Sequence, residues 1–164
     1  MALSSTNKKV IVVRFEREPL AGVSNPASFL DAGGLEILSL TGTLLRTPWE
    51  EVKAVCFVKD LPINNDAWKP NRFFAVRPKS EGLWLRFKFR DQDAMDGVIQ
   101  NNLLLLEQLG YSVVPPDPSF LNQRIFVPRS ALIEAQVMGV IGSPLRPARK
   151  PKSPAPEQIE LFGE

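Results

Sequence analysis

The segment 52–60 constrains the fold of this chain more than any other. It is a short run of β-branched and aromatic residues that ends in two charges, Lys59 and Asp60. A run of this length and composition is typical of a β-strand that is buried on both faces. We therefore expect a central strand here, with the remaining elements arranged around it.

Another strand is predicted by strict alternation between apolar and polar residues over 83–90. Side chains on a strand point alternately to its two faces, so one face is expected to be buried and the other solvated. The buried set would be Leu83, Leu85, Phe87 and Phe89, and the solvated set Trp84, Arg86, Lys88 and Arg90. Similar short runs predict strands at 9–16, 20–23, 35–40, 44–47, 72–77, 111–114 and 124–127, followed by a last apolar element at 131–140.

The segment 91–110 is compatible with two structures. Its apolar residues recur at helical spacing, Asp91 or Asp93 is suited to the start of a helix, and Gly110 to its end. However, Gly97 would weaken that helix by about 1 kcal/mol relative to Ala, and 103–106 is equally compatible with a buried strand. We favour strands, with a single helix near 93–109 as the alternative.

The two halves of the chain show a similar order of short motifs. Residues 14–15 correspond to 88–89, Gly22 to Gly97, 35–38 to 111–114 and 45–48 to 125–128. This predicts a mainly β fold in which two related small β-barrel-like units pack as one domain. The alternative is that any two β-rich segments of this size align as well.

The sequence divides into successive regions. We expect a flexible N-terminus at 1–8, a first β unit at 9–60, a connecting loop at 61–71 and a second β unit at 72–142. A linker rich in Pro and basic residues at 143–156 and a peptide motif at 157–164 would then form a disordered C-terminal tail.

Composition excludes several classes of function. The chain has no histidine and a single cysteine, Cys56, so neither a Ser-His-Asp triad nor a zinc site of ordinary composition is available. We predict a non-enzymatic protein without cofactor or metal. The absence of a disulfide framework, of a signal peptide and of a long apolar run predicts a cytoplasmic protein that does not enter the membrane.

A net charge of +2, from 20 basic and 18 acidic residues, does not by itself indicate a nucleic-acid-binding protein. One local site remains a candidate. Arg86, Lys88 and Arg90 with Trp84 would form a basic strand face able to follow a phosphate backbone and stack a base. The alternative is the solvated face of a half-buried sheet. Cys56 is expected to be a buried apolar residue, and Asp91, Asp93 and Asp96 to be turn and capping residues.

Two families of small β-barrel are similar to parts of this chain. The hairpins that end in Gly22 or Gly97, together with 124–133, resemble Sm-like or SH3-like barrels and an uncharacterised bacterial family with two such units. This resemblance implies RNA binding, although Asn101 and Asn102 follow Gly97 earlier than in the Sm pattern. Arg14, Arg17 and 31–37 are similar to the motifs of PilZ domains, which bind cyclic diguanylate. Here the arginines are one residue closer together, and the serine of the second motif is missing.

The last residues of the chain carry the most specific motif. Gln158, Ile159, Glu160, Leu161 and Phe162 resemble the peptide by which bacterial polymerases and repair proteins bind the DNA sliding clamp. The resemblance implies that Gln158 forms hydrogen bonds at the edge of the clamp groove, that Ile159 covers it, and that Leu161 and Phe162 fill its apolar pocket. The alternative is a terminal segment that docks back on the folded domain.

Overall fold

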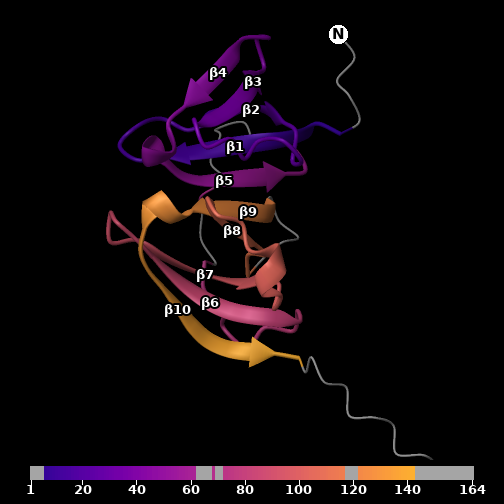
Figure 1. Cartoon of the computed structure of the whole chain (residues 1–164), viewed down its shortest axis with the longest axis vertical. Helices are drawn as coiled ribbons and strands as arrows, with labels where there is room; N and C mark the ends of the chain where they lie inside the picture. The colour runs from indigo at the N-terminus through magenta and orange to yellow at the C-terminus, as the bar shows by residue number, and fades with distance from the viewer. Residues whose placement is uncertain (1–5, 62–67, 69–71, 117–121, 143–164) are drawn as a thin grey trace, which may run out of the picture.

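The computed structural model describes residues 6–61, 68, 72–116 and 122–142, which form ten strands and three single-turn 3-10 helices (Figure 1). The predicted mainly β class is confirmed. Within these ranges the chain forms no α-helix, and hence no helix long and apolar enough to cross a membrane.

The first half of the chain forms one antiparallel arrangement. Its elements are β1 (Lys8–Arg14), β2 (Leu20–Ser24), β3 (Leu35–Ser39), β4 (Leu44–Thr47), η1 (Trp49–Glu51) and β5 (Val52–Val58). The strands lie in the order β4-β3-β2-β1-β5. All residues of β5 are buried, which confirms the strand predicted from its continuous apolar run.

The second half contains β6 (Gly82–Phe89), β7 (Ala94–Ile99), η2 (Leu103–Leu105), β8 (Gly110–Val113), β9 (Asn122–Pro128), η3 (Arg129–Ala131) and β10 (Leu132–Ile141). Strand β6 lies between β10 and β7. A bridge between Val98 and Val114 connects β7 to the end of β8, which pairs with β9. The strands of this half therefore follow one another in the order β10-β6-β7-β8-β9.

Both halves thus arrange their strands in the same order, while a repeat of the sequence itself stays a prediction. In each half the first strand lies between the second and the fifth, and a proline and a 3-10 turn separate the fourth strand from the fifth. Gly22 and Gly97 take the same place in the two halves. A Cβ at Gly22 would collide with the carbonyl oxygen of Leu38, and a Cβ at Gly97 with the side chain of Val113. Both glycines allow the second and third strands to approach closely.

The halves join through the pairing of β5 with β9. Val55 lies opposite Phe126, Cys56 opposite Ile125, and Phe57 opposite Arg124. As a result β8 and β9 extend the sheet of the first half to seven strands, while β10, β6 and β7 form a second sheet of three. In Figure 1 the pair β5 and β9 crosses the middle of the molecule, with β4 at one end and β10 at the other.

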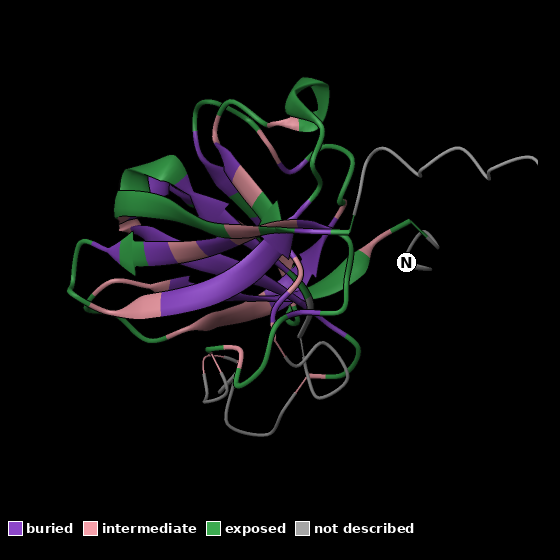
Figure 2. Ribbon diagram, turned by 90° about the horizontal axis from the view of Figure 1, so that it is seen from below, coloured by how far each residue is buried: buried purple, intermediate pink, exposed green. Residues whose placement is uncertain are grey.

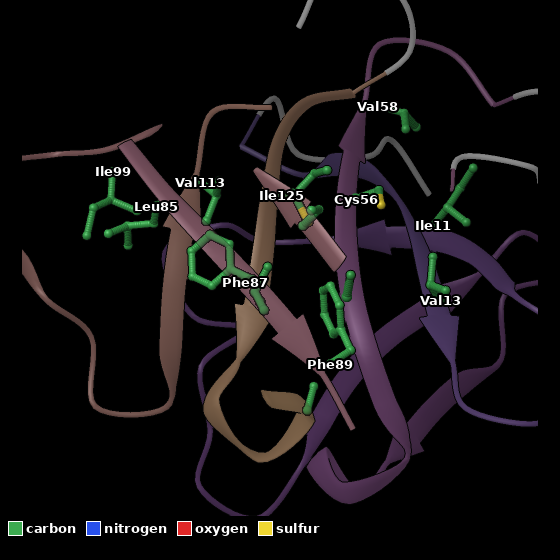
Figure 3. Packing of buried hydrophobic residues seen from close by; sticks show 14 residues of the cluster. Ile11, Val13, Cys56, Val58, Leu85, Phe87, Phe89, Ile99, Val113 and Ile125 are labelled. Atoms are coloured by element: carbon green, nitrogen blue, oxygen red, sulfur yellow. The ribbon is translucent and has the colours of Figure 1, made fainter. Parts of the chain in front are cut away.

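Two clusters of buried side chains make up the core. The larger one fills the space between the two sheets and includes Phe87 and Phe89 of β6, Ile11 of β1, Cys56 of β5 and Val113 of β8 (Figure 3). The smaller one packs Phe29 and Trp49 against the aromatic rings of Phe57 and Phe126. Buried residues lie along the strands, and the loops are mostly exposed (Figure 2).

The favoured interpretation of 91–110 as strands is confirmed for β7, which binds β6 along one edge and Val114 along the other, so the alternative helix near 93–109 does not form. Three other expectations need correction. Leu103–Leu105 is an exposed 3-10 turn and not a buried strand. Residues 72–77 form no strand. The described strands form two open sheets and no closed barrel. The predicted tail at 143–164, residues 1–5 of the N-terminus, and 62–67 and 69–71 of the connecting loop lie outside the described residues.

Candidate functional site

The outer face of β6 carries the basic residues that the sequence singled out. Arg86 lies opposite Asp96 of β7, and its Nε and Nη2 atoms donate hydrogen bonds of 2.6 and 3.0 Å to the two carboxylate oxygens. The Asp96 side chain is fully buried. A guanidinium held in this forked geometry by a buried carboxylate has fewer donors left for a phosphate.

Arg90 also makes contacts inside the protein. Its Nη2 donates to the carbonyl oxygen of Glu50, and its guanidinium carbon lies 4.1 Å from the centre of the Phe15 ring. Lys88 is exposed, and Trp84 is half-buried with its ring edge-on to Phe74. Nucleic-acid binding by this face therefore stays a prediction, with the exposed Lys88 as the cation on which to test it.

A charged cluster at the junction of the two halves was missed by the sequence reasoning. Lys53 of β5 has its ammonium nitrogen 2.7 Å from a carboxylate oxygen of Asp91 and 2.8 Å from one of Asp93, both in the turn between β6 and β7. Arg72 and the indole nitrogen of Trp68 also donate to Asp93. The one charged residue inside the apolar run of 52–58 was a signal that Lys53 needs buried partners.

The surroundings of this cluster explain its charge state. The Lys53 nitrogen lies 5.1 Å from the ring centre of Trp68, 5.2 Å from that of Phe89 and 5.9 Å from that of Phe15, so aromatic faces add to its stabilisation. Partial burial by itself would raise the pKa of Asp93. Hydrogen bonds from Lys53 and Trp68 outweigh that effect and hold the pKa well below its usual range. The cluster connects the two halves, and both Lys53 and Asp93 already bind partners within the protein.

An open cleft of about 770 Å³ lies at the same junction, among the ends of β5, β7, β8 and β9. This volume falls within the range of small-molecule sites. Its apolar lining includes the rings of Phe29, Phe57, Tyr111 and Phe126 and aliphatic side chains such as Val98 and Ile99. Its charged lining residues are Lys8, Glu81, Glu107 and Arg124. Apolar walls with charges of both signs are suited to binding a peptide segment or an amphipathic molecule.

The turn η2 extends this cleft with exposed apolar surface. Leu105 lines the cleft, and the neighbouring Leu103 and Leu104 are 76% and 93% exposed. Adjacent exposed leucines beside a cleft are a feature of binding surfaces. Within the described part of the chain, no group of residues is arranged to hold a metal ion. The cleft is therefore the candidate binding site of the folded domain.

The structure also places the predicted cysteine, the two arginines and the turn aspartate, but not the tail motif. Cys56 is fully buried, as expected, and burial raises the pKa of its thiol to about 12. The two arginines compared with the PilZ motif are engaged, Arg14 with the carbonyl oxygen of Glu18 and Arg17 with the carboxylate of Glu51. Asp91 accepts a turn hydrogen bond from the backbone of Asp93, in line with its predicted role. Gln158, Ile159, Leu161 and Phe162 lie outside the described residues.

Comparison with known proteins identifies a family for this chain but no function. Residues 6–139 match a family whose description is Family of unknown function (DUF6982). The chain belongs to this family. The DUF6982 match covers both halves of the fold and ends before the tail, so the tail motif stands apart from what the family shares. No curated protein and no solved structure is similar enough to match.

Proposed function

We propose that this DUF6982 protein is a non-enzymatic accessory protein of bacterial DNA replication or repair, recruited to the DNA sliding clamp by residues 158–162. The observation that supports this most is the match at all five positions of the clamp-binding peptide, Gln158 to Phe162. The proposal includes a cytoplasmic location and a folded domain whose cleft binds a further partner.

The position of the motif supports the proposal. The segment between Gly142, at the end of the folded domain, and Gln158 contains five prolines, at 144, 147, 151, 154 and 156. Fully extended, the 15 residues of this segment would span about 50 Å. That reach allows the peptide to occupy a groove on the clamp while the domain contacts something else.

The energetics imply a weak and reversible tether. Burial of Leu161 and Phe162 contributes roughly 3–6 kcal/mol. Ordering five residues costs about 1–2 kcal/mol each. Hydrogen bonds of the peptide backbone and of Gln158 must therefore supply the surplus. A clamp already loaded on DNA would recruit this protein transiently.

The test is a titration of the sliding clamp from the same organism into a fluorescently labelled peptide of residues 153–164. We expect saturable binding in fluorescence anisotropy, abolished by Leu161→Ala with Phe162→Ala and retained in Glu160→Ala. The full-length protein should compete with the labelled peptide. Absence of binding at high micromolar clamp would overturn the proposal.

The alternative function, an Sm-like RNA-binding or PilZ-like cyclic-dinucleotide-binding protein, draws less support from the described contacts. Arg86 is paired with a buried carboxylate, and Arg14 and Arg17 are engaged within the protein. Binding of RNA at low salt that is lost in Lys88→Glu would favour this alternative.

A further inference from the structure

The fifth strand of each half occupies the same place in its half but is covered differently. β5 is buried along its whole length, because β1 pairs with one edge and β9 with the other. β10 pairs with β6 on one edge, and no described strand pairs with its other edge. Residues 133–138 of β10 are all exposed.

The fourth strands differ in the opposite way, because described strands cover the one in the second half on both edges and the one in the first half on only one. β9 lies between β5 and β8, whereas β4 pairs only with β3 among the described strands. Among the described strands, the fourth and fifth strands of the two halves therefore meet once, as β5 with β9, and leave the corresponding edges of β10 and β4 open. These open edges lie at opposite ends of the molecule (Figure 1).

We propose that β10 of one copy pairs antiparallel with β4 of a second copy, in the register that β5 and β9 adopt within the chain. The occupant of the β10 edge is thus a second copy of this protein, bound head to tail. This interaction surface is independent of the tail motif and of the cleft.

The register follows from the prolines that precede the fifth strands. Pro48 and Pro128 stand before η1 and η3, so positions 52–57 of β5 correspond to 132–137 of β10, up to the bulge that follows Val137. In the same way, positions 44–47 of β4 correspond to 124–127 of β9. Within the chain, Phe57 lies opposite Arg124. The equivalent intermolecular pair is Val137 opposite Leu44.

The side chains in this register are complementary. Val137 and Leu44 are 58% and 64% exposed in the single chain, and pairing would bury both against each other. On the same face, Ala135 would lie opposite Arg46, and Val137 would lie diagonally next to it, so the stem of Arg46 can pack along the β10 edge. The exposed Ile133, Met138 and Val140 are an unusual composition for an edge that stays in solvent, where charges or prolines normally prevent association.

The asymmetry of the contact determines the form of the assembly. Because β10 and β4 are different surfaces, each copy keeps one open β4 and one open β10 after a single contact. Such a contact repeats from copy to copy and gives a closed ring or, where the rotation does not close, an open fibre. Pairing of β10 with β10 would instead stop at a symmetric dimer.

The test is disulfide cross-linking of the full-length chain with cysteines at the predicted pair. Cα atoms opposite each other in antiparallel strands are about 4.5–5.5 Å apart, within reach of a disulfide. The natural Cys56 is buried and does not interfere. We expect Leu44→Cys with Val137→Cys to oxidise into covalent multimers beyond the dimer. A mixture of the two single variants should give only a heterodimer.

Other outcomes would overturn the proposal. Dimers from Val137→Cys alone would indicate β10 paired with β10, and no cross-link in any combination would mean that the edges do not meet. The matched control is Leu44→Cys with Gln136→Cys, which is out of register and should cross-link less.

A second measurement does not depend on oxidation. Sedimentation velocity of the unmodified protein should show species larger than the 18.3 kDa monomer that grow with concentration. Leu44→Lys and Val137→Lys should each raise the concentration needed for assembly at least about tenfold. Mixing these two variants should restore a dimer, since each retains one intact edge. A wild-type protein that stays monomeric at high micromolar concentration would refute the pairing.

Discussion

Replacing Lys53 by Met tests whether the charged cluster holds the two halves together. The Lys53 side chain is 8% exposed and binds Asp91 and Asp93, which are 39% and 24% exposed. Removing one partner of a buried ion pair costs about 3–5 kcal/mol. Because water reaches both carboxylates here, we expect a loss of about 2–4 kcal/mol in the free energy of unfolding.

The assay is urea unfolding at pH 7, followed by tryptophan fluorescence, in a double-mutant cycle with Asp93→Asn. We expect a coupling free energy of about 1–2 kcal/mol between the two positions. The matched control is Lys9→Met, because Lys9 pairs with Asp60 at 3.2 Å with both side chains well exposed. That control should cost less than about 0.5 kcal/mol. Equal losses for Lys53→Met and Lys9→Met, or a coupling near zero, would refute the reasoning.

The pH dependence gives an independent check of the same cluster. The pKa of Asp93 is lower in the folded protein than in the unfolded chain, because the folded state stabilises its charged form. Its contribution to stability is therefore complete above the unfolded pKa of about 4 and is lost as the pH falls below that value. We expect Asp93→Asn to reduce the slope of unfolding free energy against pH between about pH 4 and 2. An unchanged slope would contradict this assignment.

The remaining predictions concern buried positions. Gly97→Ala should destabilise the protein by about 1–3 kcal/mol in urea unfolding, because its Cβ would collide with Val113. Gly139→Ala should be close to neutral, because its Cβ meets no atom nearer than 3.8 Å, and a similar loss in both variants would argue against the collision. The Cys56 thiol, with its pKa raised to about 12 by burial, should resist a thiol reagent at pH 8 until urea unfolds the protein, and rapid labelling of the folded state would show that the strand opens.

Strand positions were predictable because their signals are local. The alternation over 83–90 depends only on neighbouring residues, and the buried Leu85, Phe87 and Phe89 follow it directly. The run at 52–58 likewise indicated a doubly covered strand before its partners were known. Segment 91–110 was ambiguous because Gly97 weakens a helix without specifying a strand, and only pairing on both edges of β7 decided between them.

The junction between the halves was not predictable from local pattern. Lys53 is the one charge within the run 52–58, but the turn that holds its partners Asp91 and Asp93 lies far from it in sequence. Arg86 was read as a solvated cation, whereas Asp96, assigned to turns and caps, is its buried partner on β7. The cleft was missed for the same reason, since its lining comes from several distant strands.

The pairing of β5 with β9 has a consequence for biosynthesis. β9 begins about 64 residues after β5 ends, and at 5–20 residues per second the ribosome needs about 3–13 s to deliver it. During that interval the apolar β5 has β1 on one side and an open backbone edge on the other. The nascent first half is therefore the stage at which this protein is most exposed to misassembly, and slower translation through 59–121 would prolong it.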